Sequence, residues 1–113
     1  MLNQSLRLNK NKEFDQVFQA GHSFFGIFLG IKALKNEKNT NKFGVLVGLK
    51  ISKLAVKRNL VKRRIKSVLE KENKNLKQGY NIVVITKPEI INQNYQDIKE
   101  EILRGLNKLK LYV

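Results

Sequence analysis

The sequence predicts a single-domain α+β fold, an α/β sandwich in which helices pack on a mixed four-stranded sheet. Its 113 residues suffice for one hydrophobic core but not for two, so 1–113 is expected to form one domain with 1–8 as a flexible N-terminus. The apolar periods indicate the order helix, three strands, helix, strand, helix. The strand, helix, strand passage from 43 to 87 implies one parallel strand pair.

A short amphipathic helix comes first in the predicted fold. Asn11 is expected to cap this helix, and Gly21 is expected to stop it after Ala20. Three apolar side chains recur at the spacing of one helical face: Phe14, Val17 and Phe18. This face is expected to pack against the sheet.

Strand-forming residues dominate from 23 to 51. The run SFFGIFLGIKAL, 23–34, contains Gly26 and Gly30, which predicts a bulged strand or two short ones. The polar segment KNEKNTNK that follows predicts a turn. After the turn, KFGVLVGLKI, 42–51, predicts a strand that pairs antiparallel with the preceding one.

A second helix is expected to begin at Ser52, whose hydroxyl can accept a free amide proton of the first turn, and to end near Leu76. Four apolar residues, at spacings of seven, four and three, predict its core-facing side: Leu54, Val61, Ile65 and Val68. NIVVITK, 81–87, is almost continuously apolar, which predicts a central strand buried on both faces. A last amphipathic helix is expected from Tyr95 to Leu109.

The charge balance narrows the class of partner. The chain has 23 Lys and Arg against 9 Asp and Glu, a formal net charge of +14, so a polyanion is the expected partner, either nucleic acid or an anionic membrane. The chain has no Cys and a single His, His22, which excludes disulfides, thiolate metal sites and His-based metal clusters. No apolar run approaches the ~20 residues of a membrane span, and no signal core is evident, so an intracellular protein is expected.

The second helix concentrates this charge. The segment AVKRNLVKRRIK, 55–66, holds six cations, and no Asp or Glu occurs between Lys38 and Leu69. A merely solvated helix face usually mixes signs, because like charges four residues apart are destabilising. No Trp or Phe on this helix is available to enter a membrane interface. Nucleic acid is therefore favoured, although charge alone does not distinguish RNA from DNA.

On a helical wheel one set of side chains gathers beside the small Ala55: Asn59, Lys62, Arg63 and Lys66. The other cations are expected to flank the apolar stripe: Lys53, Lys57, Arg58 and Arg64. The cations of the two sets are then expected to cover the exposed half of the helix.

These residues resemble the signature of the bacterial ribonuclease P protein family, roughly AxxRNRxKRxxR on a helix. The matching positions in this chain are Arg58, Asn59, Lys62, Arg63 and Lys66. The similarity extends to RLNKNKEFDQVFQAG, 7–21, to KFGVLVGLKISK, 42–53, and to NIVVITK, 81–87, so it covers nearly the whole chain.

One departure from the signature affects its chemistry. Leu60 stands where the family has the second Arg, so a guanidinium fork that binds phosphate bidentately is lost. Arg64, which the usual pattern lacks, is a candidate to compensate for this loss. On this hypothesis Leu60→Arg should tighten RNA binding, and an unchanged affinity would count against it.

The resemblance implies a protein subunit of a ribonucleoprotein endoribonuclease in the bacterial cytoplasm, with a fold like the second domain of ribosomal protein S5. In that family a catalytic RNA with bound Mg²⁺ removes the 5′ leader of precursor tRNA, and the protein supplies neither catalytic nor metal-binding residues. Its implied partners are the catalytic RNA and the leader, not DNA and not a membrane. The residues implied to contact the catalytic RNA are Lys53, Lys57, Arg58, Asn59, Lys62, Arg63 and Lys66. Those implied for the single-stranded leader are the aromatic Phe14, Phe18 and Phe28 with the cationic Lys12 and Lys50.

Alternatives remain open at this level. Phe14 and Phe18 lie at the spacing of a core-facing helix side, so packing competes with base stacking as their role. A small basic ribosomal protein or RNA chaperone would share the composition without a cleavage reaction. A DNA-binding regulator is disfavoured, because a predicted strand leads directly into Ser52 where a helix-turn-helix would need a preceding helix.

Overall fold

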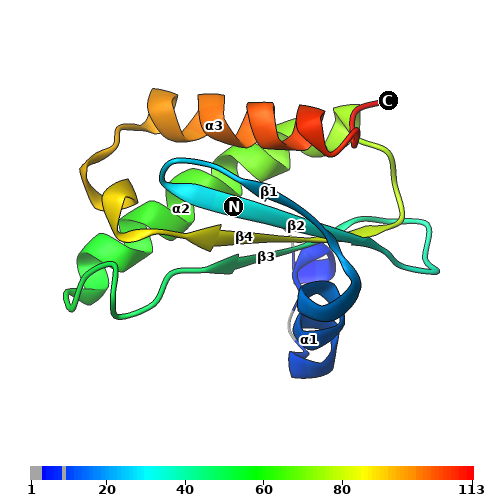
Figure 1. Ribbon diagram of the computed structural model, residues 1–113, viewed down its shortest axis with the longest axis horizontal. Helices are drawn as coiled ribbons and strands as arrows, with labels where there is room; N and C mark the ends of the chain where they lie inside the picture. Colours follow the sequence, from blue (N-terminus) through cyan, green and yellow to red (C-terminus); the bar gives the residue numbers. More distant parts are fainter. Residues whose placement is uncertain (1–3, 9) are drawn as a thin grey trace.

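A mixed four-stranded sheet separates one helix from the other two (Figure 1). The computed structural model describes residues 4–8 and 10–113. In chain order the helices and strands are α1 (Asn11–Ala20), β1 (His22–Phe25), β2 (Leu29–Lys35), β3 (Lys42–Leu46), α2 (Ala55–Glu72), β4 (Tyr80–Thr86) and α3 (Tyr95–Lys108). Short 3-10 turns cover Gln4–Leu6, Asn73–Asn75 and Pro88–Asn92. The predicted order of helices and strands is confirmed, with 23–34 forming two short strands.

The strand order in the sheet is β1, β2, β4, β3. β2 pairs antiparallel with β1 and with β4, whereas β3 pairs parallel with β4, which confirms the α+β class and the single parallel pair. The predicted antiparallel pairing of β3 with the preceding strand is wrong, because β4 lies between them. β4 takes the centre because Ile82, Val83 and Val84 are fully buried, and the shorter β3 is left at the edge.

The two faces of the sheet are covered unequally. The face toward α2 and α3 belongs to a core of eighteen buried residues, among them Ile31, Ile82 and Val84. On the face toward α1 the described residues give a second buried cluster of three, Leu8, Val17 and Val83. The helix α1 therefore covers its face of the sheet only in part (Figure 1).

The N-terminal segment contacts the outer edge of β3. The amide of Leu8 donates to the carbonyl oxygen of Phe43 at 2.8 Å, and Arg7 forms a parallel bridge with Phe43. Of the segment 1–8 that the sequence predicts to be flexible, 1–3 lie outside the described residues, while Leu8 is buried. The edge of the sheet is thus partly covered, which blunts its tendency to pair with another chain.

A buried carboxylate fixes the connection between β1 and β2. Glu101 of α3 is 1% exposed and accepts three backbone N–H bonds, from Ile27 at 2.8 Å, Phe28 at 2.9 Å and Leu29 at 3.0 Å. A Cβ at Gly26 would lie 2.6 Å from the Glu101 carboxyl carbon, so only glycine fits this approach. The hairpin is consequently held against α3.

The predicted starts of two helices are wrong. α1 begins with Asn11 as its first helical residue, and the preceding Lys10 makes no side-chain cap. α2 begins at Ala55, because the Ser52 hydroxyl accepts from the Leu54 amide at 3.1 Å and so closes a turn ahead of the helix. Leu54, predicted to face the core, is 59% exposed.

Two further boundaries differ from the prediction. β3 ends at Leu46, and the rest of the predicted strand forms a connection that buries Val47 and Ile51. α2 ends at Glu72 and continues as a 3-10 turn before the buried Leu76. The remaining core side of α2 is as predicted, with Val61, Ile65 and Val68 buried together with Leu69.

Candidate nucleic-acid interface

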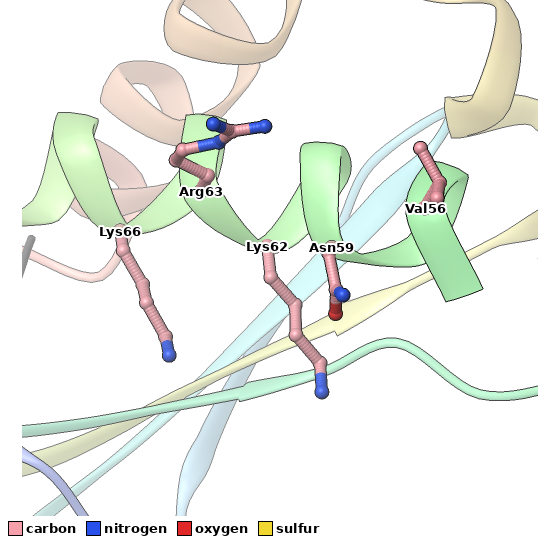
Figure 2. A pocket seen from close by; sticks show the side chains of 5 residues that line it. All are labelled: Val56, Asn59, Lys62, Arg63 and Lys66. Atoms are coloured by element: carbon pink, nitrogen blue, oxygen red, sulfur yellow. The ribbon is translucent and has the colours of Figure 1, made fainter.

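The exposed side of α2 presents a basic hollow of about 530 Å³. Its lining residues are Val56, Asn59, Lys62, Arg63 and Lys66. Figure 2 shows Asn59, Lys62 and Lys66 extending to one side of the helix, whereas Arg63 and Val56 extend to the other. All four residues that the helical wheel places together, Asn59, Lys62, Arg63 and Lys66, nevertheless line this one hollow.

No carboxylate in the described part of the chain forms an ion pair with Lys62, Arg63 or Lys66. The first acidic residue of α2 is Glu70, close to the end of the helix. Burial lowers the pKa of Lys66, and the positive charges of Arg7 and Lys62 lower it further. Because these like charges raise one another's free energy, an anion bound among them would be stabilised.

Other predicted cations of the basic segment point elsewhere. Arg58 donates from Nη1 to the carbonyl oxygen of Ser52 at 2.8 Å, so its guanidinium holds the turn before the helix. Arg64 donates from Nη1 to the carbonyl oxygen of Gln93 at 3.0 Å, on the side of α2 that meets the chain leading into α3. Lys53 precedes α2 and is exposed.

Lys57 is exposed but lies apart from the hollow on the helix surface. At about 100° per residue it is roughly 140° from Lys62 around the helix axis. The structure thus divides the predicted basic set into a hollow with three cations and a group of separated side chains.

A second, smaller hollow of about 110 Å³ joins α2 to α1 across the edge strand β3. It is lined by Arg7, Leu8, Phe14, Phe43, Gly44, Val45, Lys62 and Lys66. A Cβ at Gly44 would lie 2.5 Å from Cε1 of Phe14, so the ring lies directly on the strand backbone. Phe14 is accordingly half-buried and packs with Leu8 and Val17, in partial agreement with the core alternative.

Phe18 has a different environment from Phe14. Its side chain is 38% exposed, and Nζ of Lys32 lies 5.8 Å from the centroid of its ring. This distance is within the range of a cation–π contact. Phe18 therefore offers solvent an aromatic surface beside a positive charge.

Beyond α1 the same sheet face carries an apolar row that the sequence did not reveal. The strand register places one residue of each strand side by side in this row: Phe25, Gly30, Ile85 and Leu46. Phe25 is 75% exposed and Leu46 is 37% exposed. Strand alternation assigns a face to each of these residues, but only the register brings them together with Lys32.

The remaining predicted leader residues lie apart. Phe28 packs against the large core cluster, and its amide donates to Glu101, so it belongs to the α3 face and not with Phe14 and Phe18. Lys12 is exposed on α1, and Lys50 is exposed in the turn between β3 and α2. The structure brings neither lysine into the two hollows.

Two properties of the described residues concern metal binding and membrane spanning. No group of three or more His, Asp or Glu side chains is placed to hold a metal ion within 4–8 and 10–113. Over the same part of the chain, each helix is too short or too polar to cross a bilayer.

Comparison with known proteins identifies the family. A family model described as Ribonuclease P matches residues 2–110. The chain is 36% identical to a Ribonuclease P protein component of Clostridium botulinum over 107 residues, which is 94% of this chain and 96% of that protein. It is 32% identical to the Ribonuclease P protein component of a Pseudanabaena species over 112 residues, covering 98% and 97% of the two chains.

Solved structures share the fold. The RNase P protein of Staphylococcus aureus has a TM-score of 0.88 at 23% identity, covering 96% of this chain and 98% of its own. The RNase P protein of Thermotoga maritima has a TM-score of 0.81 at 23% identity, covering 90% and 96%. Together with the sequence matches over nearly its whole length, this shows that the chain belongs to the ribonuclease P protein family.

Proposed function

We propose that this protein binds the catalytic RNA of a bacterial ribonuclease P and the single-stranded 5′ leader of precursor tRNA, and so assists endonucleolytic removal of the leader in the cytoplasm. The observation that carries the proposal is the basic hollow of α2, where Lys62, Arg63 and Lys66 lie together without a carboxylate partner among the described residues. Unneutralised cations around one hollow can bind the phosphates of a polynucleotide backbone.

The α2 hollow is assigned to the catalytic RNA. Lysine ammonium groups and the Arg63 guanidinium bind phosphates, and Asn59 in the same hollow adds an amide that donates and accepts hydrogen bonds. Arg58 and Arg64 instead donate to backbone carbonyl oxygens, so Arg58 holds the turn before α2 and Arg64 ties α2 to the chain before α3.

The α1 face of the sheet is assigned to the leader. Phe18 and Phe25 expose rings on this face, Lys32 supplies a cation beside Phe18, and the smaller hollow at Phe14 links this face to Lys62 and Lys66. Stacking on aromatic rings tolerates any base, as a leader of variable sequence requires, and contributes ~1–3 kcal/mol per base. A strand of RNA can thereby extend from the exposed rings on the α1 face, through the smaller hollow, to the basic hollow of α2.

The chemistry is assigned to the RNA. The nine Asp and Glu of the chain are scattered, and the described residues include no group suited to holding catalytic Mg²⁺. Magnesium ions held by the RNA would supply the activated water and stabilise the leaving oxygen. The protein's part is to bring a second polyanion close to the RNA by lowering their mutual repulsion.

Reconstitution tests this proposal. The full-length protein is added to a bacterial ribonuclease P RNA and precursor tRNA, and the Mg²⁺ concentration for half-maximal accurate cleavage is measured. We expect the wild type to lower this concentration several-fold, and the Lys62→Ala/Lys66→Ala variant to lower it much less. Lys74→Ala/Lys77→Ala, which removes two exposed cations elsewhere, is the matched control. A folded wild-type protein that leaves the Mg²⁺ requirement unchanged would contradict the proposal.

A further inference from the structure

Exposed apolar side chains border the basic hollow of α2. Val56 is 80% exposed and Leu60 is 37% exposed, and we call these two residues the apolar strip. They lie four positions apart in α2, so they occupy one side of the helix. Val56 also lines the hollow with the three cations (Figure 2). At about 100° per residue, Leu60 lies about 40° from Val56 and about 60° from Arg63 around the helix axis, so the apolar strip adjoins the hollow on its Arg63 side.

The buried core does not include the apolar strip. α2 is anchored to the core by Val61, Ile65, Val68 and Leu69, which lie on the opposite side of the helix. Exposed apolar groups next to one another on a helix commonly mark an interaction surface. Leu49 and Leu54, both more than half exposed in the chain leading into α2, extend this apolar character.

Charge decides what kind of partner covers the strip. A second copy of this chain would bring Lys62, Arg63 and Lys66 against their own equivalents, with no acidic residue of α2 before Glu70 to offset them. The occupant must instead be a polyanion that also offers apolar surface. A paired A-form helix hides its base faces by stacking, whereas an unpaired nucleotide exposes one.

We propose that Val56 and Leu60 pack against the base or ribose of an unpaired nucleotide of the catalytic RNA, while Lys62, Arg63 and Lys66 bind the neighbouring phosphates. This inference rests on the proposed function and adds the kind of nucleotide that α2 selects. It also gives Leu60 a role of its own, beyond the absence of the arginine that the family signature has there. An apolar contact releases no counterions, so its contribution to affinity is independent of salt.

The test compares the affinities of full-length variants for a bacterial ribonuclease P RNA across a series of salt concentrations. Val56→Ala/Leu60→Ala is expected to weaken binding by about fivefold at every salt concentration, because buried apolar carbon is removed while every cation is kept. Ile27→Ala, which removes an apolar side chain that is 70% exposed in the β1–β2 connection, is the matched control and should leave the affinity unchanged. Thermal melts should differ by no more than a few degrees among the three proteins, since none of the replaced side chains is buried.

Further measurements make the inference falsifiable. On a fully paired RNA duplex of similar length the double variant should bind as the wild type does, and an equal loss on the duplex would overturn the selection of unpaired nucleotides. An unchanged affinity for the catalytic RNA would overturn the apolar contact. Sedimentation that shows a wild-type dimer broken by Val56→Ala/Leu60→Ala would assign the strip to a second copy and overturn it as well. If the wild-type protein does not bind the catalytic RNA, the proposed function itself is overturned. This outcome is seen with the wild type alone, before any variant is measured.

Discussion

The two faces of the sheet differ in what they do with apolar side chains. Among the described residues, the face toward α2 and α3 encloses them in a core of eighteen buried residues, whereas the face toward α1 buries three and leaves Phe18, Phe25 and Leu46 partly exposed. A chain with a net charge of +14 repels itself, so it needs one strong core to stay folded. Stability is therefore concentrated on the α2 and α3 face, and the α1 face is available for binding.

The largest effect is expected from a cavity in the large core. Ile65 is fully buried on the core side of α2, so Ile65→Ala should lower the free energy of unfolding by ~3–4 kcal/mol. Urea denaturation followed by circular dichroism measures this change. A loss below ~1 kcal/mol would remove the contrast between the faces, because the α2 and α3 face would then not carry the stability.

The second largest effect is expected at Glu101, the buried carboxylate that binds the β1–β2 connection. Glu101→Gln replaces a carboxylate that accepts three backbone N–H bonds by an amide whose NH₂ group faces some of those donors. We expect a loss of ~2 kcal/mol of stability. Amide hydrogen exchange at Ile27, Phe28 and Leu29 should become faster. If these amides exchanged at the wild-type rate, the carboxylate would not be what holds the hairpin.

Replacing Phe18 tests the contrast between the stabilising face and the binding face from the α1 side of the sheet. Phe18→Ala should leave the free energy of unfolding within ~1 kcal/mol of wild type, because the ring is 38% exposed. The affinity for precursor tRNA with a leader should fall by ~1–2 kcal/mol, with no change for mature tRNA. Both affinities are measured by titration of the reconstituted ribonucleoprotein.

Phe28→Ala is the matched aromatic control. Its ring packs against the large core, so we expect reduced stability and an unchanged leader affinity per folded molecule. The opposite pattern, with Phe18 needed for folding and Phe28 for the leader, would reverse the assignment of the two faces.

The smallest effect is expected at the C-terminal end of the chain. The Tyr112 hydroxyl donates to Oε1 of Glu72 at 2.8 Å, and burial, followed by the hydrogen bond and charge of Glu72, raises the pKa of Tyr112 above its usual value of 10.0. Because the folded state favours the protonated hydroxyl, this group contributes its full stabilisation below about pH 10, and the contribution is lost as the pH rises further. Tyr112→Phe should therefore cost ~1 kcal/mol at pH 8 and progressively less above pH 10, as measured by chemical denaturation. A difference that is constant with pH would contradict the role of the hydroxyl.

Most of the fold was predictable because it follows local periodicity. The two-sided apolar pattern of β4 predicted its central position, and the 3.6-residue stripe of α2 predicted three of its buried residues. The strand, helix, strand passage predicted the parallel pairing of β3 with β4, whereas the antiparallel pairing expected between β3 and the preceding strand was wrong because β4 lies between them. The start of α2 was missed because a serine hydroxyl can close a turn as well as cap a helix, and sequence does not distinguish these uses.

The candidate site was predictable only where one helix carries it. The helical wheel gathers Asn59, Lys62, Arg63 and Lys66 without knowledge of the rest of the fold, and the structure places all four around one hollow. The aromatic face is built from several strands, so Phe25 and Lys32 come together only through the register of β1 with β2. Glu101 gave no sequence signal, since its three donors lie more than seventy positions away.

Whether the cations of the α2 hollow bind RNA phosphates is decided by the salt dependence of affinity for a bacterial ribonuclease P RNA. Lys62→Gln/Lys66→Gln should reduce the slope of log affinity against log salt by roughly 1.4–1.8, about 0.7–0.9 for each phosphate that is no longer neutralised. The melting temperature should stay the same or rise, since removing these charges relieves repulsion. An unchanged slope in a folded variant would show that the hollow faces no phosphate and would contradict its assignment to RNA.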